Sequence, residues 1–254
     1  MPGQGRLLVP KPIHQKWDRM IKSYNHISQR VDSITSKRGL SMANFRTKDG
    51  SVIEYYQFAL RMASILDKIY FAAKCVEYLG KIYKQRTKSH EVAIDSITKT
   101  LPHDFTFYMD VFFTFSYSAF DYVAQVLHMM INTGLKEDQV YFANVIQSLA
   151  SPKSPNSCLL FDALIKESEK GWIYELRHYR VFTAHHATIP LTRRFSYTAK
   201  DQTVEILDAM LPDNPKDAPH TFNKKRELVP YCVDVLSKEL DSMKDIFDFI
   251  GSLI

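Results

Sequence analysis

The chain has 254 residues, of which 45% are hydrophobic and 24% are charged. This composition excludes a disordered chain, a collagen and a disulfide-framed miniprotein, and a chain of this length buries roughly 70–75% of its extended surface on folding. Glycine contributes only 8 residues, and a chain with few tight turns favours long helices. The net charge of +5 is compatible with a polyanionic partner but does not require one.

The cysteines and the apolar segments indicate a cytoplasmic protein. The chain contains three widely spaced cysteines, Cys75, Cys158 and Cys232. An odd number without a Cys-x-x-Cys pair is typical of reduced thiols, and the N-terminus has no apolar segment of the signal-peptide kind. Residues 108–131 are long enough to cross a bilayer, but Asp110 and Asp121 lie inside this stretch. A carboxylate at the bilayer centre costs at least about 2.5 kcal/mol, so we predict a buried helix and no membrane span.

The first 50 residues predict a tail, a helix and a turn. Residues 1–15 contain three prolines and are predicted to form a flexible tail. A first helix is expected over 16–36. The polar segment 40–50 follows it and contains Asp49-Gly50, a turn signal.

A long helix is predicted over 51–86. Ser51 can cap its first turn, and Glu54 stands three residues later, which is the spacing of a capping box. Apolar residues recur along it at intervals of three and four, and a basic run that includes Lys81 suits its C-terminus. A shorter helix is expected over 89–100.

Three further helices follow in the middle of the chain. The first covers 104–133 and stops at Gly134, and the second covers 137–150. The third, over 159–188, stops before Pro190 and carries the most unusual group of side chains.

The C-terminal third predicts a β-hairpin and a last helix. The hairpin falls within an irregular insertion over about 190–221, and the helix covers 223–252. The helix carries a heptad seam, formed by Val229, Val233, Leu236, Leu240, Met243, Phe247, Ile250 and Ile254. Such a seam packs inside a bundle of the same chain or against a second copy. The sequence therefore predicts one α-helical domain over 16–254, an up-and-down bundle of four to six helices with a small hairpin insertion.

The helix over 104–133 is apolar nearly all round but carries a narrow polar stripe. The stripe consists of Asp110, Thr114, Tyr117, Asp121, Gln125, His128 and Asn132, which fall within an arc of about 80°. It is either the solvent side of a surface helix or the polar wall of a cleft. If the stripe is the wall of a cleft, the flanking aromatic residues Phe113, Phe120 and Tyr122 are placed to stack on bases.

Basic and aromatic side chains are concentrated in the segment 172–190, WIYELRHYRVFTAHHATIP. Its basic and imidazole groups are Arg177, His178, Arg180, His185 and His186. Arginine offers a planar donor fork that suits phosphate, and histidine moves protons near neutral pH. This combination favours phosphodiester chemistry. An exposed basic patch without chemistry is the alternative. A zinc site at His185-His186 is disfavoured because adjacent helical residues point about 100° apart, so we expect no metal and no cofactor.

These residues resemble the signature of the HEPN superfamily. Arg180 and His185 fit the pattern R-x4-H, Arg180 and His186 fit R-x5-H, and the surrounding LRHYR…HH is similar to a form found in several branches. SAFDYVAQVL at 118–127 is similar to the helix that precedes this motif in such proteins. The resemblance covers about 105–190 and implies an all-α fold.

The resemblance implies a metal-independent endoribonuclease with a site shared across a homodimer. Arg180 would bind the scissile phosphate and stabilise the transition state. His185, or His186, would take the proton of the 2′-OH group, and Asp121 would orient a partner side chain. The expected RNA-binding residues are Arg177, His178, Tyr179, Arg193 and Arg194.

Many proteins of this superfamily are instead non-catalytic. They bind nucleic acid or a partner protein of the nucleotidyltransferase or antitoxin type. Val181 stands where the family commonly has Asn, Asp or His, and this departure favours the binding-module alternative.

Overall fold

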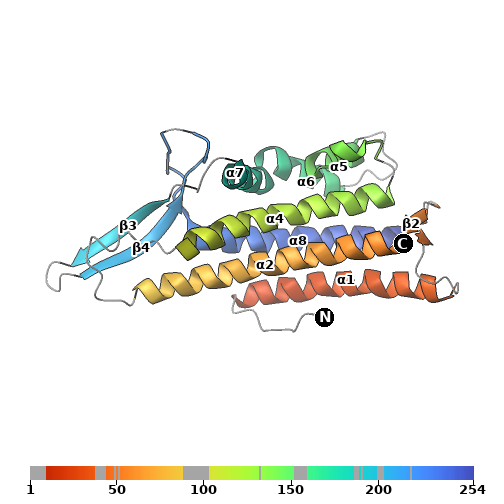
Figure 1. Cartoon of the computed structure of the whole chain (residues 1–254), viewed down its shortest axis with the longest axis horizontal. Helices are drawn as coiled ribbons and strands as arrows, with labels where there is room; N and C mark the ends of the chain where they lie inside the picture. Colours follow the sequence, from red (N-terminus) through yellow and green to blue (C-terminus); the bar gives the residue numbers. More distant parts are fainter. Residues whose placement is uncertain are drawn as a thin grey trace. The chain divides into compact units, whose positions relative to one another are not determined.

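The structure is a computed structural model. It describes residues 10–37, 44–48, 50, 52–87, 103–131, 133–151, 159–185, 189, 191–198, 203–217 and 219–254. These residues form an all-α helical bundle with a small β insertion, as the sequence predicts (Figure 1). The α-helices are α1 (Lys11–Lys37), α2 (Tyr55–Thr87), α4 (His103–Met130), α5 (Phe142–Ala150), α6 (Leu159–Lys170), α7 (Trp172–His185) and α8 (Leu228–Leu253), with a 3-10 turn η1 (Glu137–Gln139) before α5.

The first helix starts earlier than the sequence predicts. Residues 11–15 were expected in a flexible tail but belong to α1. Pro12 is tolerated there because the backbone N–H groups of a first helical turn have no partner within the helix. Residues 1–9 and the helix expected over 89–100 lie outside the described part of the chain.

A two-stranded hairpin replaces the predicted start of the second helix. Strand β1 (Asn44–Arg46) pairs antiparallel with β2 (Val52–Glu54), so residues 52–54 are not helical as expected. Phe45 lies opposite Ile53 and both are buried, whereas their neighbours along each strand are exposed. Gly50 has φ +89°, a backbone conformation that favours glycine. The Asp49-Gly50 turn signal therefore outweighs the capping-box spacing.

A break at Gly171 divides the single helix expected over 159–188 into α6 and α7. A side chain at position 171 would collide with Glu167. Without one, a carboxylate oxygen of Glu167 accepts the backbone N–H of Trp172 at 3.1 Å, and the Glu167 carbonyl accepts the N–H of Gly171 at 3.1 Å. The bond to Trp172 satisfies a donor at the start of α7. Because of this break, the described part of the chain has seven α-helices, whereas four to six were expected.

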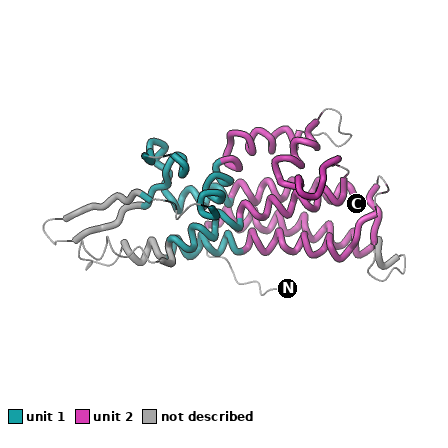
Figure 2. Tube along the Cα trace, turned by 45° about the horizontal axis from the view of Figure 1, so that its top comes forward, with its two compact units in different colours: residues 1–9, 71–115, 175–236 teal, residues 10–70, 116–174, 237–254 magenta. Residues whose placement is uncertain are grey.

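The chain divides into two compact units, each built from three separate stretches (Figure 2). Unit 1 comprises residues 1–9, 71–115 and 175–236, and unit 2 comprises residues 10–70, 116–174 and 237–254. Parts of α2, α4, α7 and α8 belong to each unit.

Unit 2 is a helical bundle in which α1 contacts both α2 and α8. Trp17 and Tyr70 pack at 6.2 Å between ring centroids, while Tyr55 at the start of α2 bonds Asp32 near the end of α1, so α1 and α2 are antiparallel. Lys16 pairs with Asp241, and Arg30 donates to the Gly251 carbonyl at 2.8 Å. These two contacts show that α8 runs parallel to α1.

The heptad seam of the last helix is used inside the chain. Leu236, Leu240, Met243, Phe247, Ile250 and Ile254 are all buried. In unit 2, Phe247 packs against Tyr24 of α1 at 6.0 Å. The seam therefore packs within the bundle, the first of the two arrangements that the sequence left open.

A carboxylic acid lies in the core of unit 2. Glu239 of α8 has no exposed surface, and neither carboxylate oxygen has a hydrogen-bond partner of normal geometry among the described residues. Burial raises the pKa of Glu239 to about 8, while the nearby hydroxyl of Ser116, also buried, lowers it. The group is therefore largely protonated at neutral pH.

Unit 1 contains the predicted hairpin. Strand β3 (Thr192–Thr198) pairs antiparallel with β4 (Thr203–Leu211), which confirms this element, and β5 (Arg226–Glu227) adds a third strand beside Met210 and Leu211. None of the helices in the described part of the chain is both long and apolar enough to cross a membrane.

Candidate functional site

The candidate catalytic residues lie on the part of α7 that belongs to unit 1. Arg180 lies inside the helix, half-buried with its Nε atom enclosed, and His185 is the exposed last residue. Five residues of helix separate them by about 140° around the axis. Arg180 and His185 of one helix therefore point to different sides. His186 lies outside the described residues.

A different set of basic residues shares one face of α7. Arg177, His178 and His185 fall within an arc of about 100°, and Arg180 lies about 60° to the side of Arg177. Arg177 and His185 are exposed and His178 is half-buried. This face therefore combines a fixed cation with two imidazole groups.

Tyr179 is a core residue, which corrects its assignment to RNA binding. Its side chain is 1% exposed and stacks on Phe113 of α4 at 4.7 Å, with Tyr231 of α8 edge-on at 5.8 Å. Its hydroxyl donates to the Pro212 carbonyl at 2.5 Å. Burial raises the pKa of Tyr179 to about 12, although Arg226 lowers it. A ring enclosed in this way is not available to stack on a base.

The only acid of α7 is held by residues from the segment before α8. Glu175 accepts hydrogen bonds from the Arg226 guanidinium and from Lys224, the latter at 3.0 Å. Arg226 also donates to the Tyr179 hydroxyl at 3.1 Å and to the Asp213 carbonyl at 2.9 Å, and its side chain is only 10% exposed. Arg226 therefore fixes this segment to α7.

The structure places the polar stripe of α4 between core and surface. Asp110, Gln125 and His128 are half-buried, and Asn132 lies outside the described residues. In unit 2, Gln125 accepts a hydrogen bond from Arg61 at 3.1 Å, and His128 bonds Thr133 at 2.6 Å.

Two of the three aromatic residues beside this stripe do not flank a wet face, and the third, Tyr122, is half-buried. Phe113 and Phe120 are fully buried, and Phe120 packs on Phe142 at 4.7 Å. The expectation that they stack on bases is wrong, because they complete the hydrophobic core.

Two carboxylates of α4 belong to different units. Asp110 lies in unit 1, and burial raises its pKa to about 6. Asp121, the expected orienting residue, is half-buried in unit 2, whereas Arg180 and His185 belong to unit 1. The orienting role of Asp121 stays a prediction.

The two arginines expected to bind RNA from the hairpin are placed only by their backbone. Arg193 lies opposite Ala209 and Arg194 opposite Asp208, and the register shifts directly after Arg194. Their side chains lie outside the described part of the chain. Among the residues that the structure does describe, no three His, Cys, Asp or Glu side chains are grouped so as to hold a metal ion.

Unit 1 carries a partly exposed group of aromatic and lysine side chains, here called the aromatic–lysine face, that was not predicted from the sequence. It consists of Phe71, Lys74, Tyr78 and Lys81 of α2 with Phe107, Tyr108 and Phe115 of α4. Tyr78 stacks face to face on Tyr108 at 4.8 Å, Phe71 packs on Phe115 at 5.6 Å, and Lys81 lies 5.2 Å from the Tyr78 ring centroid. Phe107 is 60% exposed and Tyr78 is 42% exposed.

The charge of this face is positive but partly compensated. Lys74 and Lys81 both pair with Glu77, at 3.0 and 2.6 Å, so two cations share one carboxylate. Tyr108 and the core residue Phe113 are about 140° apart around α4, so this face and α7 lie on different sides of that helix. A helical spacing in the sequence, Phe71-Lys74-Tyr78-Lys81, could have revealed the α2 half of the face.

No family model, curated protein or solved structure matches this chain. The assignment of function therefore rests on the residues of α7 and of the aromatic–lysine face.

Proposed function

We propose that the protein is a metal-independent endoribonuclease whose site is formed by α7, with Arg180 and His185 supplied by two copies of the chain. The observation that carries the proposal is the position of His185, exposed at the end of α7, one and a half turns after Arg180. The helix presents further basic groups, while its one acid, Glu175, is held by Arg226 and Lys224. This arrangement favours binding of a polyanion at α7.

The proposed reaction uses the ribose as its own nucleophile. Neutral His185 removes the proton of a 2′-OH group, and the 2′-oxygen forms a bond to the adjacent phosphorus. Arg180 stabilises the charge on the non-bridging phosphate oxygens. The bond to the 5′-oxygen breaks, and that oxygen takes a proton from water. The products are a 2′,3′-cyclic phosphate and a free 5′-OH.

The two-copy arrangement answers the geometry of the helix. Arg180 and His185 are about 140° apart on α7, so one helix does not aim both at the same phosphate. A second copy that supplies the other residue removes this difficulty. Six of the eight residues of the heptad seam of α8 are buried within the chain, so this part of the seam does not supply the dimer interface.

The test is a cleavage assay on mixed cellular RNA in EDTA. We expect wild-type protein to leave 2′,3′-cyclic phosphate ends, and His185→Ala and Arg180→Lys to lose at least about 100-fold in rate. His14→Ala, a histidine on α1 in unit 2, is the matched control and should cleave as wild type does. An equal mixture of His185→Ala and Arg180→Lys should recover part of the activity, because mixed dimers hold one intact site.

Three outcomes would contradict the proposal. Cleavage by His185→Ala at the wild-type rate would remove that residue from the site. Activity of a protein that sediments only as a monomer would contradict the shared site. Absence of cleavage by pure wild-type protein would leave the binding function as the better proposal.

A second candidate function, binding of unpaired RNA without cleavage, is favoured by the aromatic–lysine face. Exposed rings beside lysines bind single strands through base stacking and phosphate contacts. We expect Phe107→Ser and Lys81→Gln to weaken binding of a short single-stranded RNA, measured by fluorescence anisotropy. Tyr141→Ser, an equally exposed ring in unit 2, should not. Unchanged affinity in both variants would exclude this face.

The pH dependence separates the two functions. Cleavage requires His185 in its neutral form, so its rate should be lower in acid than at neutral pH. Binding alone should strengthen as pH falls, because the histidines of α7 become charged.

A further inference from the structure

The exposed side of α7 in unit 1 keeps a positive charge. In the part of α7 that belongs to unit 1, the fixed charges are those of Arg177, Arg180 and Glu175. The carboxylate of Glu175 is already bound by Arg226 and Lys224. Arg177 is exposed and makes no ion pair with any residue that the structure describes. The helix therefore presents cations without a carboxylate of its own to balance them.

This face has too little apolar surface to join two copies by itself. Between Arg177 and His185, the apolar residues on this side of the helix are Val181 and Ala184, and Val181 is half-buried. The part of α7 in unit 1 is about 16 Å long and roughly 10 Å wide. Such a face is far smaller than the roughly 800 Å² that each partner contributes to a stable interface. Contacts between two α7 helices alone therefore do not hold a dimer.

Two faces of this kind also repel each other. The shared site of the proposed function brings Arg180 of one copy close to His185 of the other. Arg177 lies between these two positions around the helix axis, so the arginines of both copies come close together as well. Like charges at this separation oppose association. A chain of phosphates between the two helices reverses the effect, because each phosphate carries a negative charge that both copies attract.

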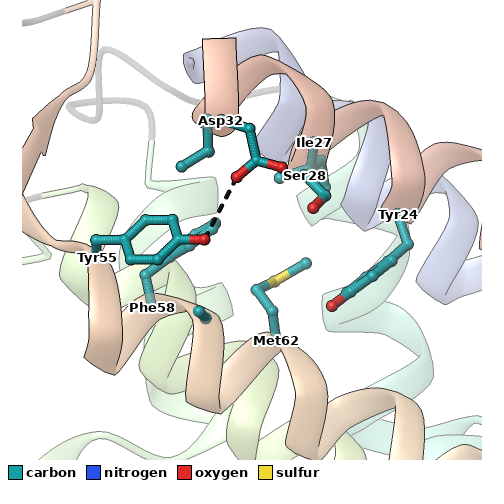
Figure 3. Close-up of a pocket in the computed structure, with 9 residues that line it drawn as sticks. Tyr24, Ile27, Ser28, Asp32, Tyr55, Phe58 and Met62 are labelled. Carbon is teal, nitrogen blue, oxygen red and sulfur yellow. Dashed lines mark hydrogen bonds between the residues drawn. The ribbon is translucent and has the colours of Figure 1, made fainter. Parts of the chain in front are cut away.

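The hollow between α1 and α2 in unit 2 does not compete with α7 for an anionic strand (Figure 3). The Tyr55 hydroxyl donates to an Asp32 carboxylate oxygen at 3.3 Å, and the Tyr24 hydroxyl and the Met62 side chain also lie toward this space. None of the nine residues that line it is basic, and it admits only a few water molecules.

We propose that a single RNA strand joins two copies of the chain, and that the copies stay apart without it. The inference rests on the shared site of the proposed function and adds what assembles that site. The strand lies between two α7 helices, and its phosphates compensate the charges of Arg177 and Arg180 from both copies. A copy that has bound no strand then has only half of the site. The substrate therefore assembles the enzyme that cleaves it.

Sedimentation velocity with a strand that resists cleavage tests this inference. A 2′-O-methyl RNA of about eight nucleotides keeps the phosphates, lacks the attacking hydroxyl and falls within the usual size of one single-strand site. We expect the full wild-type chain to be monomeric alone and to form a complex of two chains on one strand when chains outnumber strands. In about tenfold excess of strand, this complex should fall roughly tenfold, because each strand then holds one chain.

Matched variants separate the face of α7 from the net charge of the protein. Arg177→Gln should lower the amount of the two-chain complex at least about tenfold at equal concentrations, because each complex loses two phosphate contacts. Arg19→Gln removes the same charge from an exposed position on α1 in unit 2 and should pair as wild type does. Equal effects of the two variants would overturn the inference, since net charge would then control the pairing.

Two further results would overturn the inference, and each is distinct from a failure of the proposed reaction. A wild-type dimer that forms equally well without the strand would mean that another surface joins the copies, and the shared site would stand. Failure of the strand to bring two chains together at any ratio would mean that RNA does not join them. If the wild-type protein nevertheless cleaves RNA, that second result would contradict the shared site as well. Sedimentation with the strand present, and not of the protein alone, therefore decides whether the site is shared.

Discussion

The buried carboxyl group of Glu239 should make the stability of the protein fall as pH rises. Glu239 has no exposed surface, and no hydrogen-bond partner of normal geometry reaches its oxygens among the described residues. Glu239→Gln keeps the volume of the side chain but removes its ability to ionise. The comparison of this variant with wild-type protein therefore isolates the cost of a buried charge.

The magnitude follows from the two pKa values of this group. The ordinary value is 4.5, and burial raises the pKa to about 8 in the folded chain. Below pH 4.5 the group is protonated in both states and has no effect on the pH dependence. Between the two values only the unfolded state releases its proton, so the free energy of unfolding falls by about 1.4 kcal/mol for each pH unit. Above pH 8 the loss reaches its limit of about 5 kcal/mol.

Urea unfolding at several pH values between 5 and 8.5 measures this effect. We expect Glu239→Gln to exceed wild type by less than about 1 kcal/mol at pH 5 and by roughly 4 kcal/mol at pH 7.5. The control is Glu169→Gln, because this exposed side chain on α6 undergoes the same change without burial. Parallel pH profiles for wild type and Glu239→Gln would refute the reasoning, since they would mean that the carboxyl group is solvated or ion-paired in the folded protein.

Three other variants or labels test the packing. Tyr179→Phe should lower the free energy of unfolding by about 1–3 kcal/mol, because the Pro212 carbonyl and the Arg226 guanidinium both lose the hydroxyl that they bond. Tyr174→Phe, which changes an exposed ring, should leave the free energy of unfolding unchanged. Gly134→Ala should lower the free energy of unfolding by about 1–2 kcal/mol, measured by thermal unfolding, because the φ angle of this residue is +67°. Gly80→Ala, inside α2, should instead stabilise the protein. Equal effects of the two variants would mean that the backbone at position 134 relaxes. Burial raises the pKa of Cys75 to about 12, so a thiol reagent at pH 8 should label this residue only after unfolding. Rapid labelling of Cys75 itself in the native protein, located by peptide mapping, would contradict its burial.

The long helices could be predicted from sequence because their apolar periodicity exceeds any local competing signal. The elements that were missed are short and depend on one residue. At the start of α2, a capping-box spacing and a turn signal overlap within six residues, and only the pairing of Phe45 with Ile53 decides between them. At Gly171 the break depends on how the Glu167 side chain folds back, which periodicity does not report.

The candidate site was predictable in residue type but not in exposure. Tyr179 and Arg180 are adjacent in a segment of uniformly basic and aromatic character, yet the first is core and the second is half-exposed. Phe113 and Phe120 lie in the core because α4 is apolar nearly all round, and only tertiary contacts decide which of its faces is buried. Glu239 is a polar residue whose burial was equally hidden. It stands alone beside a heptad seam, and nothing in the sequence indicates that its side chain is enclosed.

The pairing of α1 with α8 has a consequence for how the chain is made. The contact between Arg30 and Gly251 spans 221 residues, and at common synthesis rates the ribosome needs roughly 10 to 45 s to cover that distance. During this interval the apolar side chain of Ile27 on α1, which lies next to Gly251 of α8, has no final partner. Unit 2 is therefore completed only after α8 has been synthesised, and the emerging chain offers a lasting target for chaperones that recognise exposed hydrophobic segments.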